Sequence, residues 1–229
     1  MIMNTPNKQA EKIGNLELNK VYCMDALELL KQIPDKSVDL VLTDPPYGIN
    51  MTSDGFGGSK NADKTEYVEI DNWDNKSPSI EYFNELLRVG KKVIIFGGNY
   101  FLDKLPKGYF HVWDKRCGIT PERTYADGEI IWFNFREPLR IFRFLWDGFI
   151  QDKKNKIKDK REHPTQKPVL LIQELISKYS ESNDIVLDCF IGSGTTAVAC
   201  KQLGRNFIGC DNCQEYVNIA NKRLEQSIL

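Results

Sequence analysis

Four consecutive residues, Asp44-Pro45-Pro46-Tyr47, bring together groups that suit the recognition of an amino group. Together with Thr43 they directly follow the apolar run Val38–Leu42, which predicts a buried strand that the prolines bring to an end. The Asp44 carboxylate and the Pro45 carbonyl are both acceptors, and an NH₂ group has two hydrogens to donate. The Tyr47 ring offers a flat face for stacking. The pattern predicts a site for the amino group of a planar base; the alternative is a Pro-Pro turn beside a solvated aspartate.

A glycine-rich turn near the other end of the chain has the character of a nucleotide-binding turn. The segment Asp188–Thr196 joins a short apolar run to a helix that opens near Ala197. Its glycines, Gly192 and Gly194, let the backbone approach a ligand closely, and the helix N-terminus presents free N–H groups. Asp211 ends the next apolar run, where a carboxylate can bind ribose hydroxyls. Both motifs follow predicted strands, and ligands of open α/β sheets bind at the edge formed by the carboxyl ends of the strands. The two motifs are therefore predicted to share one site.

In this order the motifs resemble those of the amino-methyltransferases that use S-adenosylmethionine (AdoMet), specifically the permuted β group, in which D-P-P-Y precedes the cofactor turn F-x-G-x-G. The segments 22–30 and 163–168 (H-P-T-Q-K-P) share the resemblance, which spans most of the chain. It implies an α/β fold, the Rossmann-like fold of AdoMet-dependent methyltransferases with circularly permuted motif order. The expected architecture is a mostly parallel seven-stranded sheet with an antiparallel hairpin and helices on both faces.

The resemblance implies a DNA methyltransferase that transfers a methyl group from AdoMet to the N6 amino group of adenine, after the base has left the duplex stack. It makes Asp44, Pro45, Pro46 and Tyr47 the catalytic residues. The residues that it assigns to AdoMet are Asp25, Ala26, Thr165, Lys167, Asp188, Phe190, Gly192, Gly194, Thr195 and Asp211. Of these, Thr165, Lys167 and Thr195 would hold the amino-acid end of AdoMet. The implied substrate is double-stranded DNA, and a homodimer and a cognate restriction enzyme are candidate partners.

Six of the nine residues from Lys153 to Arg161 are basic. Such a run is usually a solvated surface, but it directly precedes the H-P-T-Q-K-P segment, where the family inserts its DNA-reading segment. Residues 146–163 are therefore predicted to be a short DNA-contacting insertion. The residues expected to contact phosphates are Lys153, Lys154, Lys156, Lys158 and Arg161. Residues 48–73 are polar and dotted with glycine, which predicts a loop over the active site, with a plain flexible insertion as the alternative.

Hydrophobic periodicity predicts the elements that position these motifs. Strands are expected at 18–24, 93–96, 109–115, 185–188 and 205–210, and helices at 26–33, 77–89, 168–179 and 214–227. Asp25 is a natural N-cap for the first helix. Ser77 and Pro78 are expected to begin the second helix. Residues 127–135 and 139–145 alternate around 136–138 and are expected to form the hairpin.

Composition is that of an ordinary globular chain, with 41% hydrophobic and 28% charged residues among 229. One domain spanning 1–229 is expected. No run approaches the roughly 18 apolar residues of a membrane span, and the first residues lack the apolar core of a signal peptide, so we expect a cytoplasmic protein without membrane contact. Because the net charge is −1, a DNA enzyme of this composition must concentrate its positive charge locally.

The six cysteines are scattered and are predicted to be mostly small buried hydrophobes. Cys210 and Cys213 have the spacing of half a zinc site, but no second pair accompanies them and the only histidines are His111 and His163. We therefore predict no metal site. His111 is expected to be a core or edge histidine.

Three other functions fit parts of the sequence. The first is methylation of another amino group. Cytosine N4 is chemically equivalent to adenine N6, although related cytosine enzymes more often have Ser in place of Asp44. RNA and the side-chain amide of a protein glutamine are further candidate acceptors, although the glutamine enzymes more often have Asn at this position. A dinucleotide-binding oxidoreductase matches a loose G-x-G-x-x-A pattern that starts at Gly192, but it leaves the D-P-P-Y motif without a role. A non-catalytic DNA-binding protein of the same fold is the third alternative.

Overall fold

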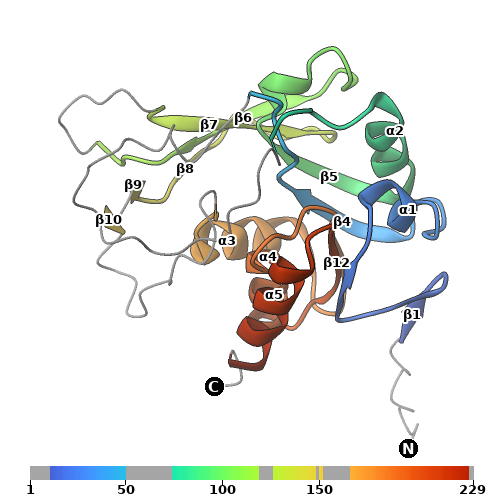
Figure 1. The fold of residues 1–229 in the computed structure, drawn as a ribbon. Helices are drawn as coiled ribbons and strands as arrows, with labels where there is room; N and C mark the ends of the chain where they lie inside the picture. The colour runs from blue at the N-terminus through green and yellow to red at the C-terminus, as the bar shows by residue number, and fades with distance from the viewer. Residues whose placement is uncertain (1–10, 50–73, 119–125, 148–149, 152–165, 227–229) are drawn as a thin grey trace, which may run out of the picture.

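The computed structural model describes residues 11–49, 74–118, 126–147, 150–151 and 166–226. A mixed eight-stranded sheet forms the centre of this part of the chain (Figure 1). In spatial order its strands are β3 (Lys20–Cys23), β12 (Asn206–Asp211), β11 (Ile185–Asp188), β4 (Val38–Thr43), β5 (Gly90–Phe96), β7 (Gly128–Phe133), β6 (Tyr109–Asp114) and β8 (Ile141–Arg143). Two short pairs accompany it, β1 (Lys12–Ile13) with β2 (Leu16–Glu17) and β9 (Trp146–Asp147) with β10 (Ile150–Gln151).

The strands from β3 to β5 are parallel, whereas β7 runs antiparallel to both of its neighbours. The mostly parallel sheet is confirmed, but it has eight strands rather than seven. The predicted hairpin between 127–135 and 139–145 is wrong, because β6 lies between β7 and β8: Val112 of β6 is opposite Ile130 of β7 and Ile141 of β8. Alternation indicates that a segment is a strand but does not identify its partner, which is why the hairpin was predicted wrongly.

Five α-helices and one 3₁₀ helix of the described chain cover the sheet. They are α1 (Ala26–Leu30), α2 (Ile80–Val89), η2 (Gly98–Phe101), α3 (Val169–Tyr179), α4 (Thr195–Leu203) and α5 (Gln214–Gln226). None of these helices is long and apolar enough to cross a bilayer.

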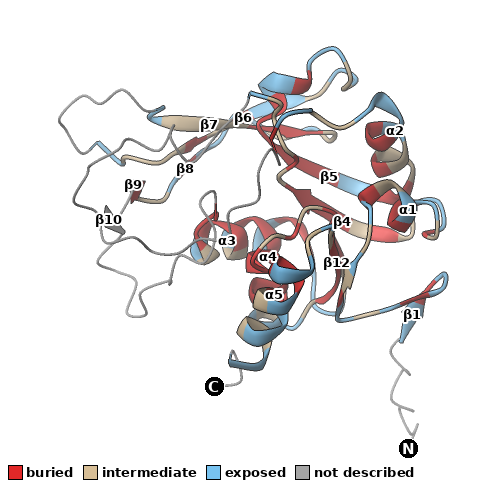
Figure 2. Ribbon diagram, viewed as in Figure 1, coloured by how far each residue is buried: buried red, intermediate tan, exposed pale blue. Residues whose placement is uncertain are grey.

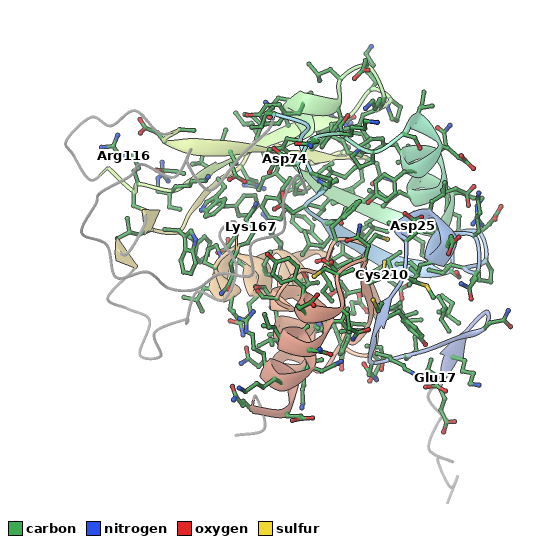
Figure 3. All side chains as sticks on the ribbon, viewed as in Figure 1. Glu17, Asp25, Asp74, Arg116, Lys167 and Cys210 are labelled. Carbon is green, nitrogen blue, oxygen red and sulfur yellow. The ribbon has the colours of Figure 1, made fainter. Side chains whose placement is uncertain are left out.

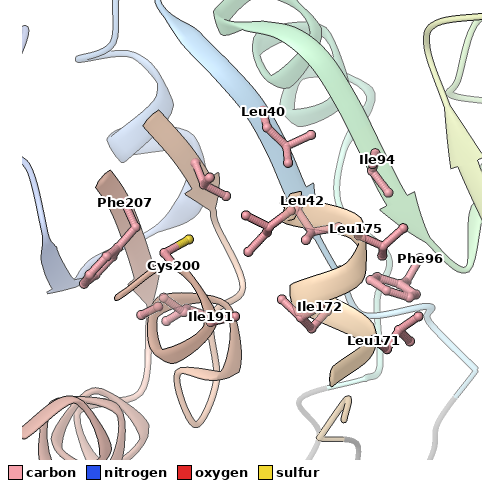
Figure 4. Close-up of a cluster of buried hydrophobic side chains, with 14 of the residues drawn as sticks. Leu40, Leu42, Ile94, Phe96, Leu171, Ile172, Leu175, Ile191, Cys200 and Phe207 are labelled. Carbon is pink, nitrogen blue, oxygen red and sulfur yellow. The ribbon is translucent and has the colours of Figure 1, made fainter. Parts of the chain in front are cut away.

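Two buried clusters on opposite faces of the sheet form the core. Leu40 and Leu42 of β4 pack with α3, α4 and α5, whereas Val41 packs with α1 and α2. Figure 4 shows the first cluster, in which Leu42 lies near side chains of α3. Figure 2 shows buried residues along the central strands and exposed residues on the outward surfaces of the helices. Helices on both faces are thus confirmed, and the alternation along β4 follows from side chains pointing to opposite faces of a strand.

The helix starts follow their capping groups. Asp25 accepts hydrogen bonds from the N–H groups of Leu27 (2.8 Å) and Glu28 (3.2 Å), so it is the N-cap of α1, which was the alternative to the AdoMet contact that the resemblance implied. The predicted start of α2 is wrong by two residues, because Ser79 is the N-cap and Pro78 lies outside the helix. Lys104 donates to the Ser77 hydroxyl and to the Pro78 carbonyl (2.9 Å), so these two groups anchor a neighbouring segment instead.

The cysteines and His111 follow their predictions in part. Cys189, Cys200 and Cys210 are buried, but Cys23 and Cys117 are exposed, so burial was wrongly expected there. Cys23 ends β3, which is at the edge of the sheet formed by the described residues, so one side of the strand has no neighbouring strand among them. His111 is fully buried; its Nδ1 accepts from the Arg140 N–H (3.1 Å), and its Nε2 has no partner among the described residues.

The glycine-rich turn before α4 gives a test of this packing. Gly194 has a φ of 85°, and a Cβ there would lie 2.7 Å from the Cβ and 2.9 Å from the Cα of Ala220 in α5; Gly192, with a φ of 49°, would meet no atom within 4 Å. Both alanine variants carry left-handed strain, but only Gly194→Ala must also displace α5. Its free energy of unfolding should therefore fall by about 1–3 kcal/mol more than that of Gly192→Ala. Urea unfolding measures the difference, and equal values would contradict the contact.

Candidate active site

A cavity of about 420 Å³ opens at the carboxyl ends of β4, β11 and β12. The D-P-P-Y motif follows β4, Asp188 ends β11 and Asp211 ends β12, so the sheet brings the two sequence motifs to one edge. The predicted site residues that line the cavity are Asp44, Pro45, Pro46, Tyr47, Lys167, Asp188, Phe190, Gly192, Thr195 and Asp211. This is the edge at which ligands of open α/β sheets bind.

The remaining predicted residues lie elsewhere. Asp25 and Ala26 are at the start of α1 and do not line the cavity, and Figure 3 shows Asp25 apart from Lys167. Gly194 does not line it either; it is the N-cap of α4, and Ala220 packs beside it. The residues that fall outside the described part of the chain are Thr165, Lys153, Lys154, Lys156, Lys158 and Arg161, with most of the 48–73 and 146–163 segments.

Two donors hold the Asp44 carboxylate. The Tyr47 hydroxyl donates to Oδ1 at 2.7 Å, and the Lys167 ammonium forms an ion pair with Oδ2. Burial raises the pKa of Asp44, and the positive charge of Lys167 opposes that rise. Burial alone would lower the pKa of Lys167, but the carboxylates of Asp44 and Glu129 outweigh it and raise that pKa. Lys167 is therefore a cation, and it favours the ionised, hydrogen-bond-accepting form of Asp44.

The Tyr47 ring lies between aromatic and backbone groups. It stacks on Tyr100 with the centroids 4.6 Å apart and the planes 15° apart. A Cβ on Gly97, whose φ is 67°, would lie 2.2 Å from Tyr47 Cε1, so only glycine leaves room for the ring there. Burial and the neighbouring carboxylates raise the pKa of Tyr47 well above its usual value, so its hydroxyl remains a donor.

The glycine-rich turn and its two carboxylates form the other half of the cavity. Asp188 accepts from the hydroxyls of Thr43 (3.0 Å) and Thr196 (2.6 Å) and from the Phe190 N–H (3.1 Å), while burial raises its pKa to about 6. These bonds join β4, β11 and α4, so Asp188 supports the turn. Asp211 accepts from the Gly192 N–H at 3.1 Å, and burial raises its pKa as well.

This half of the cavity fits AdoMet. The whole cavity, which also includes the Asp44 side, has a volume in the range of small-molecule sites, roughly 300–1,000 Å³. The space beside the Gly192 Cα is open. The Phe190 and Tyr216 rings and the Asp211 carboxylate line the cavity around this turn, and they match the apolar, aromatic and ribose-binding contacts that a nucleoside needs. No group of three or more His, Cys, Asp or Glu residues that could hold a metal occurs in the described part of the chain.

Sequence reasoning missed two carboxylates of the site. Asp74 is buried, lines the cavity and accepts from the N–H groups of Gly48 (2.9 Å) and Ile49 (3.3 Å), so it fastens the chain directly after Tyr47. Glu129 in β7 also lines the cavity and contacts Lys167 at 3.3 Å. The one signal in the sequence was Glu129 itself, a carboxylate next to the apolar residues of a strand. A charged side chain that is buried needs a partner, so this position could have been identified as part of an ion pair.

Comparisons with known proteins show the family of this chain. The family model described as "DNA methylase" matches residues 107–222. The Type II methyltransferase M.HinfI of Haemophilus influenzae is 31% identical over 91% of this chain and 69% of its own length. The Type II methyltransferase M1.MboII of Moraxella bovis is 31% identical over 92% and 98%, respectively.

Solved structures share the fold. The M1.HpyAVI–SAM complex has a TM-score of 0.56 at 24% identity, covering 90% of this chain and 98% of that one. The PvuII cytosine-N4-specific DNA methyltransferase has a TM-score of 0.57 at 18% identity, covering 89% and 85%. With the sequence matches and the cavity geometry, the conclusion is that this chain belongs to the DNA methylase family of AdoMet-dependent amino-methyltransferases that act on adenine N6 or cytosine N4.

Proposed function

We propose that this protein methylates the N6 amino group of adenine in double-stranded DNA, with AdoMet as the methyl donor. The observation that carries the proposal is the Asp44 carboxylate, an acceptor that lines the cavity together with the glycine-rich turn. The relatives named above are Type II methyltransferases, which supports a modification role beside a cognate restriction enzyme. The likeness to a cytosine-N4-specific enzyme reflects the shared fold, so adenine is proposed from Asp44 and not from fold.

The chemistry requires orientation more than activation. AdoMet, when bound, supplies a methyl group that its sulfonium already makes electrophilic. The lone pair of the adenine amine is delocalised into the ring, and hydrogen bonds to Asp44 and to the Pro45 carbonyl would localise it on nitrogen. The same acceptors stabilise the positive charge that grows on that nitrogen. Asp44 therefore does not have to remove a proton before the amine attacks.

The base has to leave the duplex to reach this position. Extrusion costs a few kcal/mol, which stacking in the pocket and contacts to phosphates offset. We assign the stacking to Tyr47, whose ring Gly97 and Tyr100 hold in place. Around AdoMet we assign Phe190, Gly192 and Asp211, which line the cavity.

Several cofactor contacts rest on the family resemblance alone. They are those of Asp25, Ala26, Thr165 and Gly194, whereas Asp188 and Thr195 also line the cavity. Lys167 was assigned to the amino-acid end of AdoMet on the same basis. Its ammonium already contacts Asp44 and Glu129, so the AdoMet carboxylate would be a third partner.

Identifying the base that receives the methyl group tests the proposal most directly. Duplex DNA incubated with the purified protein and AdoMet should yield N6-methyldeoxyadenosine after digestion to nucleosides, because Asp44 accepts from an adenine amine. Mass spectrometry of the nucleosides distinguishes this product from N4-methyldeoxycytidine. The cytosine product would refute the adenine assignment, and purified protein that carries NAD would favour the oxidoreductase alternative.

Replacing the carboxylate tests its role. Asp44→Asn keeps the shape of the side chain but turns one acceptor oxygen into a donor, so methyl transfer should fall by at least about 100-fold, the usual cost of losing one such electrostatic contact. AdoMet affinity, measured by calorimetry, should stay within a few-fold because the glycine-rich turn is unchanged. A variant that methylates DNA at the normal rate would rule out this mechanism.

The basic run tests the proposed DNA contact. Changing Lys153, Lys154, Lys156, Lys158 and Arg161 to Gln should weaken binding to duplexes of any sequence, since phosphate contacts carry no sequence information. Each lost phosphate contact should also reduce the slope of log K against log salt by about 0.9. A control variant changes three lysines elsewhere, Lys12, Lys20 and Lys31, to Gln; none of them lines the cavity. If both variants have the same affinity and slope as the unmodified protein, the basic run does not contact DNA.

A further inference from the structure

Glu129 connects the groups around Asp44, and neither the sequence motifs nor the proposed chemistry gives it a role. It is the second residue of β7, and its side chain lines the cavity with only 17% of its surface exposed. It forms ion pairs with Lys115 and with Lys167, the latter at 3.3 Å, and the Tyr47 hydroxyl lies 3.5 Å from Oε2. Glu129 therefore contacts both of the side chains that hold Asp44.

The charges of this cluster balance. Asp44 and Glu129 supply two carboxylates, and Lys115 and Lys167 supply two ammonium groups. Burial would raise the pKa of Glu129, but the two lysines outweigh it and lower that pKa. Lys115 pairs with Oε1 of Glu129, and Lys167 lies between Oε2 of Glu129 and Oδ2 of Asp44. A buried charge that loses its partner is strongly destabilising, so Lys167 has to stay near one of the two.

Substrate binding disturbs this balance at Asp44. Both of its oxygens already accept a donor, one from Tyr47 and the other from Lys167. An amine that donates to Asp44 competes most directly with the lysine, because an ammonium at the same oxygen also repels the positive charge that grows on the amine nitrogen. The ammonium has a second acceptor within reach, Glu129 Oε2 at 3.3 Å.

We propose that Glu129 is a positioning residue that receives the Lys167 ammonium when the substrate amine binds Asp44. Glu129 thereby frees an acceptor on Asp44 without leaving a buried cation unpaired. This role rests on the proposed function, in which Asp44 accepts the amine. The Lys167 ammonium thus stays paired throughout the reaction, with Asp44 before the substrate amine binds and with Glu129 afterwards.

The variant Glu129→Gln tests this role because it keeps the size of the side chain and removes its charge. Lys167 then has no second protein carboxylate beside Asp44 and stays on Asp44, so the single-turnover rate of methyl transfer should fall about tenfold or more. AdoMet affinity should change by no more than a few-fold. The matched control is Glu137→Gln: Glu137 is 18% exposed and also pairs with two cations, Arg140 (2.9 Å) and Lys178 (3.4 Å), but it does not line the cavity. The control should retain the full rate.

The pH profile separates positioning from a merely structural role. The ionisable groups around Asp44 are Tyr47, Lys167, Glu129 and Asp188. The negative charge of Glu129 raises the pKa of Asp44. Asp44 is active as the carboxylate, so the rate is lost as the pH falls through that pKa. Glu129→Gln should therefore move the acid limb to lower pH while reducing the plateau rate, a combination that loss of structure would not produce.

A second variant covers the case in which Glu129→Gln folds poorly. Glu129→Asp keeps the charge but withdraws the carboxylate by one methylene, so the plateau rate should fall without the shift of the acid limb. A plateau rate within twofold of the unmodified protein in both variants would overturn the inference. The proposed function and the role of Asp44 have their own tests: the identity of the methylated base decides the function, and an active Asp44→Asn refutes the role of Asp44. An inactive Asp44→Asn with fully active Glu129 variants refutes only the role of Glu129.

Discussion

The ion pair between Asp44 and Lys167 is the interaction on which the site depends. A carboxylate that is mostly buried, as that of Asp44 is, is stable only when donors compensate its lost hydration. Asp44 has such donors in Tyr47, three residues away, and in Lys167, which is 123 residues away in the chain. The prolines that end β4 hold Asp44 at the sheet edge. Lys167 immediately precedes the Pro168 cap of α3, so the site forms only when α3 has packed on the sheet.

The order of the strands explains how two distant motifs come to share one cavity. β11 pairs in parallel with β4, with Val186 opposite Leu40 and Leu187 opposite Val41. Their carboxyl ends therefore coincide, and the Thr43 hydroxyl donates to Asp188 across the junction at 3.0 Å. This bond fixes the segment that leads to Asp44 against the glycine-rich turn. The distance between the Asp44 side of the cavity and the glycine-rich turn is thus set by the central pair of strands and not by a loop.

The sequence predicted the elements whose signals are local. Asp25 as a helix cap, the apolar strands and the glycine-rich turn were all recognised from patterns within a few residues. What it could not supply were long-range pairings: β6 separates β7 from β8, and Glu129 meets Lys167 only through the sheet. The start of α2 was predicted wrongly for a different reason. Ser77 and Ser79 are equally good N-caps as judged from the sequence, but Lys104 donates a hydrogen bond to the Ser77 hydroxyl, and Ser79 caps the helix. Contacts of this kind depend on tertiary structure, about which the periodicity of the sequence carries no information.

The most direct measurement is a crystal structure of the protein with AdoMet and a target duplex. We expect the flipped adenine to place its amine nitrogen about 3 Å from an Asp44 carboxylate oxygen and from the Pro45 carbonyl. The methyl carbon of AdoMet should face that nitrogen from the side of the glycine-rich turn. A complex in which the methyl group points away from Asp44, or in which other groups bind the amine, would contradict this account of the site.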